Sequence, residues 1–332
     1  MSLDLSDNAQ AVLLLASPLI RGRGKENNKV KLFTPSEYND LHKILIKLKM
    51  QPSMLLEKEG LDILFKNLDL TWDKERIQEL LNRGFQLSVC VEHWSAHGIW
   101  ILCNSDSQYP ERLKNLGHNA PPIIYCCGSI ELIEGGGLAV VGSRAIADDV
   151  LKFTQQVGIH CAKDNLTLVS GGARGVDQES MFSCLDNGGS VIGVLAERLA
   201  DAALSSKSRP YLDKELLLIS PFDPEVRFNV GNAMSRNKLI YAMSDYGLVV
   251  ESGFEKGGTW AGAMELLKSK LDIPLFIRSD ADAGKGNLAL LEKGGISWPN
   301  DFSEKQLSEY LLDLSKKKPI KKASDKQLNL GL

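Results

Sequence analysis

The spacing of apolar residues divides the chain near residue 98. Before this point apolar residues recur every three or four positions, a period that predicts amphipathic helices. Thr34-Pro35-Ser36-Glu37 adds helix-capping chemistry at the start of one of them. We therefore expect residues 1–98 to form a small helical N-terminal domain, with helices over 37–49, 55–68, 73–82 and 88–96.

From residue 99 onward the pattern changes to short, continuous apolar runs. They lie at residues 99–102, 138–141, 166–169, 191–195, 216–219, 247–250 and 274–277. From residue 138, most of them are separated by amphipathic stretches long enough for one helix. This alternation predicts an α/β domain over 99–300, with a parallel sheet covered by helices on both faces. Residues 301–332 read as a C-terminal helix and a flexible basic tail.

Charge and cysteine content narrow the classes of protein. The 332 residues carry a formal net charge of -3, so an anion site requires a local concentration of positive charge. The six cysteines form no C-x-x-C pair and suggest no metal site. They read as reduced thiols of a cytoplasmic protein. No apolar run approaches about 18 residues, so we expect no membrane-spanning segment.

The loop after the run at 138–141 is a candidate anion site. It reads Gly142-Ser143-Arg144. A glycine lets the backbone approach a phosphate, and Ser143 and Arg144 supply hydrogen-bond donors. An ordinary strand–helix turn with a surface arginine would have the same sequence.

A second candidate follows the run at 166–169, where Ser170-Gly171-Gly172-Ala173-Arg174-Gly175 places three glycines within five residues. So many glycines at a strand–helix junction reduce stability and are typically retained where a ligand approaches the backbone. Asp177 follows in the predicted first helical turn, where a structural capping role is favoured over a reactive one.

The third candidate, Lys256-Gly257-Gly258-Thr259, opens another predicted helix and forms a second cradle of positive charge and N–H groups. It matches neither the Walker pattern nor the G-x-G-x-x-G fingerprint, which argues against NAD. We expect no cofactor.

Nothing in the chain resembles a nucleophile with its base, so we expect no catalytic residues and no enzyme activity. In residues 235–238, Arg236 and Lys238 can equally be solvated surface charge.

Taken in order, these motifs resemble the DprA/Smf family of DNA-processing proteins. Residues 106–113 match its D-x-x-Y-P-x-x-L pattern, and the loops at 142–144 and 170–177 match its glycine motifs. Ser235-Arg236-Asn237-Lys238 resembles its R-N-R element, with Lys238 in place of the second arginine. The loop at 257–259 stands where the family has S-G-S/T. The resemblance covers residues 95–280.

The resemblance implies a Rossmann-like domain that binds single-stranded DNA in a positive pocket at the carboxyl edge of the sheet. It implies a homodimer, a role in DNA uptake, recombination or defence against foreign DNA, and the RecA recombinase as a possible partner. The residues that it assigns to DNA contacts are Ser143, Arg144, Gly171, Gly172, Arg174, Arg236, Lys238, Lys256, Gly258 and Thr259.

The chain ends with Gln327-Leu328-Asn329-Leu330-Gly331-Leu332 after a lysine-rich stretch. This resembles the peptides by which bacterial replication proteins dock on the sliding clamp, with Gln327, Leu328, Leu330 and Leu332 as the anchors. A terminus that happens to contain three leucines is the alternative.

Two other functions fit parts of the sequence. A nucleotide sensor or a phosphoribohydrolase-like enzyme would use Gly257-Gly258-Thr259 with Glu265, although the spacing differs from the P-G-G-x-G-T-x-x-E loop of such enzymes. A defence-system scaffold would bind a protein partner through the N-terminal helices. It would show no affinity for DNA.

Overall fold

The computed structural model describes residues 5–22, 30–299 and 306–316. The predicted clamp-docking residues Gln327, Leu328, Leu330 and Leu332 lie outside these ranges. Of the predicted C-terminal helix and tail, the structure describes helix α13 (Leu307–Lys316).

The N-terminal part is helical, as the period of apolar residues predicts. Its helices are α1 (Asp7–Ala16), α2 (Pro35–Lys47), α3 (Lys58–Asn67), α4 (Lys74–Leu81) and α5 (Gly84–Ala96), with a short 3-10 turn η1 (Pro52–Leu56). Helix α2 begins at Pro35, two residues before the predicted start, because Thr34 is its N-cap and forms a reciprocal capping box with Glu37.

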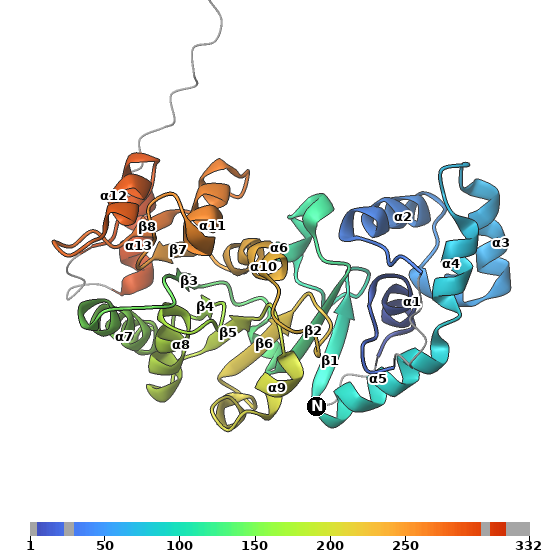
Figure 1. Ribbon diagram of the computed structural model, residues 1–332, viewed down its shortest axis with the longest axis horizontal. Coiled ribbons are helices and arrows are strands. Elements are labelled where there is room, and N and C mark those ends of the chain that lie inside the picture. The colour runs from blue at the N-terminus through green and yellow to red at the C-terminus, as the bar shows by residue number, and fades with distance from the viewer. Residues whose placement is uncertain (1–4, 23–29, 300–305, 317–332) are drawn as a thin grey trace, which may run out of the picture.

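The remaining part is built on a nine-stranded sheet with the order β1-β2-β6-β5-β4-β3-β7-β8-β9 (Figure 1). Seven neighbouring strands, in the spatial order β6-β5-β4-β3-β7-β8-β9, run parallel to one another. This confirms the predicted Rossmann-like α/β architecture. The strands are β1 (Ile99–Cys103), β2 (Ile123–Gly128), β3 (Leu138–Val141), β4 (Leu168–Ser170), β5 (Val191–Val194), β6 (Leu216–Ser220), β7 (Tyr246–Val249), β8 (Leu275–Ile277) and β9 (Ile296–Ser297).

One edge of the sheet departs from the parallel pattern. Strand β2 runs antiparallel to β6, and β1 runs antiparallel to β2. This hairpin-like pair carries the N-terminal helices, because α1 and α5 pack against β1. The N-terminal helices therefore share one hydrophobic cluster with the sheet, which runs from Leu13 and Leu15 to Leu138 and Val191.

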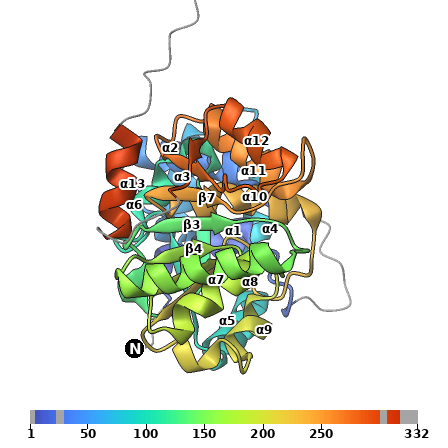
Figure 2. The same cartoon turned by 90° about the vertical axis from the view of Figure 1, so that its left-hand side faces the viewer.

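Helices cover both faces of the sheet (Figure 2). The cluster on one face includes residues of α7 (Asp148–Lys163), α8 (Val176–Asp186), α9 (Leu199–Leu204) and α13. The cluster on the other face includes residues of α6 (Glu111–Lys114), α10 (Val230–Ala242), α11 (Gly257–Lys268) and α12 (Lys285–Glu292). Short 3-10 turns η2 (Gly117–Asn119), η3 (Ile130–Leu132) and η4 (Arg209–Tyr211) complete the connections. The loops at the strand ends remain available for a ligand.

Candidate nucleic-acid interface

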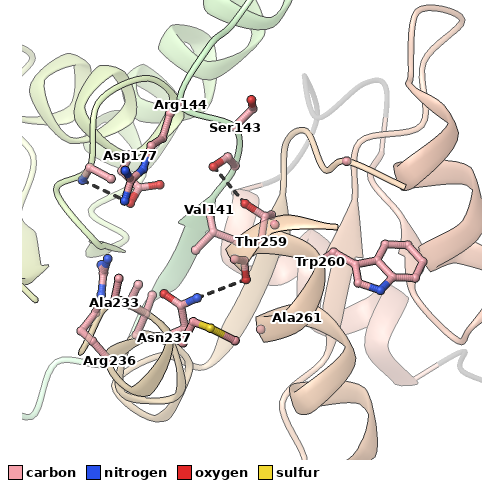
Figure 3. A pocket seen from close by; sticks show the side chains of 18 of the residues that line it. Val141, Ser143, Arg144, Asp177, Ala233, Arg236, Asn237, Thr259, Trp260 and Ala261 are labelled. Atoms are coloured by element: carbon pink, nitrogen blue, oxygen red, sulfur yellow. Dashed lines mark hydrogen bonds between the residues drawn. The ribbon is translucent and has the colours of Figure 1, made fainter. Parts of the chain in front are cut away.

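A pocket of about 810 Å³ lies at the carboxyl edge of the sheet, where the loops after β3 and β7 meet α10 (Figure 3). The chain winds from β3 through β4 and β5 to β6, and then returns to β7 on the other side of β3. This reversal makes β3 and β7 a topological switch point. At such points the loops diverge and leave a crevice for ligands.

The loop after β3 forms one wall of the pocket. Gly142 is required for close packing, because a Cβ there would overlap the side chain of Val176. Ser143 Oγ donates a hydrogen bond to the carbonyl of Ala145 at 2.8 Å, which orders the loop. Arg144 extends over the ring of Phe228, with 5.1 Å from Cζ to the ring centroid. A cation held over an aromatic face remains able to donate to a phosphate.

Arg236 forms the floor of the pocket from α10. Only 5% of the residue is exposed, and Nη1 donates to the carbonyl of Val194 at 2.9 Å. Its Nε has no hydrogen-bond partner. The guanidinium fits only because residue 171 is glycine, since a Cβ at that position would overlap it. Arg236 lines the pocket, and its buried positive charge favours an anion there.

Asp177 lies beside Arg236, in the first turn of α8. It is 6% exposed and accepts hydrogen bonds from the backbone N–H groups of Gly142, Gly171 and Ala173. Burial nevertheless raises the pKa of this carboxyl to about 6, against the opposing effect of Arg236. Burial and the nearby Arg144 lower the pKa of Arg236. Asp177 thus fastens the loops after β3 and β4 to the start of α8, which agrees with the structural role expected for it.

The opposite wall is the N-terminus of α11. Lys256 occupies the N-cap position, and no side chain caps the helix. Its first N–H groups, at Gly257, Gly258 and Thr259, are therefore available to an anion. The hydroxyl of Thr259 donates to the Gly142 carbonyl at 3.0 Å, and this bond joins the two walls.

Comparisons with known proteins show which family the chain belongs to. The model of the DNA recombination-mediator protein A family matches residues 100–305, which is more than half of the chain. The chain belongs to this family. The resemblance to DprA/Smf proteins is thereby confirmed.

Curated relatives of the family align with the sheet-bearing part. Protein Smf of Synechocystis is 28% identical over 203 residues, covering 58% of this chain and 50% of the relative. The DNA processing protein DprA of Streptococcus pneumoniae is 28% identical over 173 residues, covering 51% and 61%. The chain thus spans between half and two thirds of the length of these relatives.

Solved structures of the family share the fold. DprA from Streptococcus pneumoniae superposes with a TM-score of 0.63 at 18% identity, covering 88% of this chain and 94% of that one. DNA processing protein A from Helicobacter pylori superposes with a TM-score of 0.52 at 22% identity, covering 67% and 97%. The latter structure is described for its single-stranded DNA binding mode.

The pocket brings together six of the ten family residues expected to contact DNA. They are Ser143, Arg144, Arg236, Lys256, Gly258 and Thr259. Gly171 makes room for the Arg236 guanidinium, whereas Gly172 packs against Leu195. Arg174 is exposed on the loop after β4, and it does not line the pocket.

Lys238 lies elsewhere. Its ammonium is 3.4 Å from the carboxylate of Glu265, and both residues line a separate pocket of about 550 Å³ between α10, α11 and the chain after α6. Glu265, the carboxylate that a phosphoribohydrolase-like enzyme would need, is therefore absent from the lining of the candidate site. Arg236, by contrast, is buried and not a solvated surface charge.

Asn237, Phe228 and Tyr241 are among the lining residues of the pocket that were not selected as site residues from the sequence. Asn237 donates from Nδ2 to the Gly258 carbonyl at 3.2 Å and ties α10 to the start of α11. Phe228 supports Arg144, and Tyr241 lies at the back wall, where burial raises the pKa of its hydroxyl. Asn237 stands between Arg236 and Lys238 in the R-N-R-like element, so its position in this motif could have identified it from the sequence. Phe228 carries no such signal.

Other kinds of site receive no support from the described part of the chain. Within it, no group of three or more histidine, cysteine or carboxylate residues is arranged to hold a metal ion. The six cysteines are buried free thiols. None of the helices in the described ranges is long and apolar enough to cross a membrane.

Proposed function

We propose that the protein binds single-stranded DNA in the pocket between the loops after β3 and β7. One observation carries the proposal: Arg144, Arg236 and the uncapped start of α11 open into the same cavity. The binding mode described for the Helicobacter pylori relative, which shares the fold, supports this choice of ligand.

The chemistry of the pocket suits a sugar-phosphate backbone. The two guanidinium groups and Lys256 would neutralise phosphates, and the N–H groups of Gly257 and Gly258 would position them. Such contacts do not read base edges, so binding should tolerate different sequences. Phe228 is 47% exposed at the rim and offers a face to an unpaired base.

The wider biological role is part of the same proposal. The protein would act in DNA uptake, recombination or defence against foreign DNA, without a catalytic centre of its own. Its partners would include a second copy of the chain, the RecA recombinase and the sliding clamp, the last through Gln327, Leu328, Leu330 and Leu332. Gly171, Gly172, Arg174 and Lys238 remain predicted contributors to the DNA interface.

Replacing Arg144 tests the pocket directly. Arg144 is preferable to Arg236, because a buried residue also supports the fold. We expect Arg144→Ala to weaken binding of a fluorescent thymidine oligonucleotide about tenfold, or ~1.4 kcal/mol, in an anisotropy titration. Arg209→Ala is the matched control, because this exposed arginine lines a different pocket near β1 and β2. Equal affinities of the wild type and Arg144→Ala would refute the proposed site.

A further inference from the structure

We propose that single-stranded DNA leaves the pocket along an arginine row formed by Arg174, Arg198 and Arg227. The row would hold the strand over β4, β5 and β6, towards the N-terminal helices, and not over β7, β8 and β9. This inference rests on the proposed function, and it assigns a DNA-binding role to Arg198 and Arg227.

The row follows the order of the strands. Arg174 comes in the loop after β4, Arg198 in the loop after β5 and Arg227 in the loop after β6. These strands are neighbours in the sheet, and β3, whose loop carries Arg144, adjoins β4 (Figure 1). Because neighbouring strands lie about 4.8 Å apart, the edge from β3 to β6 spans roughly 14 Å. Arg144 and the row thus offer one cation for each strand end.

Backbone contacts hold the neighbouring loops together. Gly175, next to Arg174, packs so closely on the carbonyls of Ser143 and Arg144 that a Cβ would overlap them. The N–H of Arg198 donates to the carbonyl of Val226 at 2.9 Å, which places the last two loops side by side. Phe228, the residue after Arg227, returns to the Arg144 guanidinium. The row is therefore continuous with the pocket.

Arg198 has an unusual backbone conformation. Its φ of 49° lies in the left-handed region, which glycine adopts at little cost and arginine adopts with strain. Its side chain is 59% exposed, and it approaches only the exposed carboxylates of Asp201 at 3.7 Å and Glu197 at 3.9 Å. Exposed pairs of this kind contribute little stability. An arginine retained at such a position indicates a role for its charge.

The other half of the same edge carries carboxylates beside Lys256 and Lys285. Glu251 follows β7, and Asp280 and Asp282 follow β8. The one arginine after β8, Arg278, is 3% exposed and already bound to Asp280 at 2.6 Å and Asp149 at 2.8 Å. Its charge is neutralised by these carboxylates.

The loop after β6 also holds Asp223 and Glu225, but Asp223 is buried and accepts the N–H of Ile20, and Glu225 contacts Arg21 and His93. These engaged carboxylates leave the exposed Arg174 and Arg227 to favour a strand that runs from the pocket towards β6.

The test compares two lengths of thymidine oligonucleotide, about 6 and about 20 nucleotides, in anisotropy titrations over a range of salt concentrations. The variant is the double substitution Arg198→Gly with Arg227→Ala, because glycine suits the left-handed backbone at position 198. Lys285→Ala is the matched control, since Lys285 is exposed at the start of α12, beyond β8. Thermal melting of each variant confirms that it is folded.

We expect the double variant to bind the long oligonucleotide about tenfold more weakly and the short one within about twofold of wild type. The slope of log affinity against log salt should fall by about 1.4 on the long oligonucleotide, since each phosphate contact on a single strand contributes about 0.7. Wild-type affinity and slope in the double variant would overturn the row while leaving the pocket intact. Weaker binding of the long oligonucleotide by Lys285→Ala would contradict the proposed path of the strand towards β6. Failure of the wild type to bind either length would refute the proposed function itself.

Discussion

At the scale of single residues, Asp177 and Arg236 place opposite charges under the floor of the pocket, where both are almost fully buried. The carboxylate accepts three backbone N–H groups, yet burial raises its pKa to about 6. Its neutral form is thus favoured in the folded protein relative to the unfolded chain, where an aspartate titrates near 4. The same residue both joins the loops after β3 and β4 and compensates part of the Arg236 charge.

This raised pKa predicts a pH-dependent stability. The contribution of Asp177 to the free energy of unfolding is complete below about pH 4 and is lost as the pH rises through about 6. The free energy of unfolding, measured with urea, should therefore fall less between pH 4 and pH 7 in Asp177→Asn than in wild type. Asp148→Asn, at the exposed start of α7, should retain the wild-type profile. Identical profiles for Asp177→Asn and wild type would contradict the raised pKa.

The sequence identified the pocket residues in the loop after β3, because a glycine and two hydrogen-bond donors, Gly142-Ser143-Arg144, directly follow the apolar run of that strand. It did not identify the burial of Arg236. The groups that surround this guanidinium, the carbonyl of Val194 and the glycine at 171, are distant in the sequence. Lys238, two residues away on the same helix, faces another pocket for a similar reason. Only the fold decides which side of α10 meets the strand ends.

At the scale of elements, the period of apolar residues predicted most helices and strands within a few residues. It predicted a parallel sheet, whereas β1 and β2 run antiparallel to their neighbours. Strand direction depends on the connection and not on the side-chain period, and no crossover helix of usual length joins β1 to β2. The N-terminal helices were expected to form a domain of their own. That division stays a prediction, and their apolar side chains lie in the same hydrophobic cluster as residues under the sheet.

Because the N-terminal helices and the sheet share one hydrophobic cluster, we expect them to unfold together. Leu15 in α1 is fully buried in the common cluster, so Leu15→Ala should cost about 2–5 kcal/mol and lower the midpoint of one cooperative transition. Leu70, which is fully exposed after α3, supplies the control, and Leu70→Ala should leave the midpoint unchanged. Calorimetry with far-UV circular dichroism measures both. An early, separate transition for the N-terminal helices, with the remainder melting as in wild type, would contradict this account.

At the scale of the whole molecule, a net charge of -3 and the proposed interface for DNA are compatible because cationic side chains gather in one pocket at the edge of the sheet. Arg144, Arg236 and Lys256 gather where β3 and β7 diverge, and carboxylates lie beyond β7. A field of this kind attracts phosphates locally without making the protein basic. Binding should therefore depend on salt far more than the overall charge suggests.

The most direct test of the central claim is a titration of the wild-type protein with single-stranded and duplex DNA of one sequence at two salt concentrations. We predict tighter binding of the single strand, because the pocket admits one backbone and offers Phe228 to an unpaired base. We also predict that this affinity falls as salt rises, with a slope of about 0.7 per phosphate contact. Absence of binding, equal affinity for the duplex, or an affinity independent of salt would contradict the account.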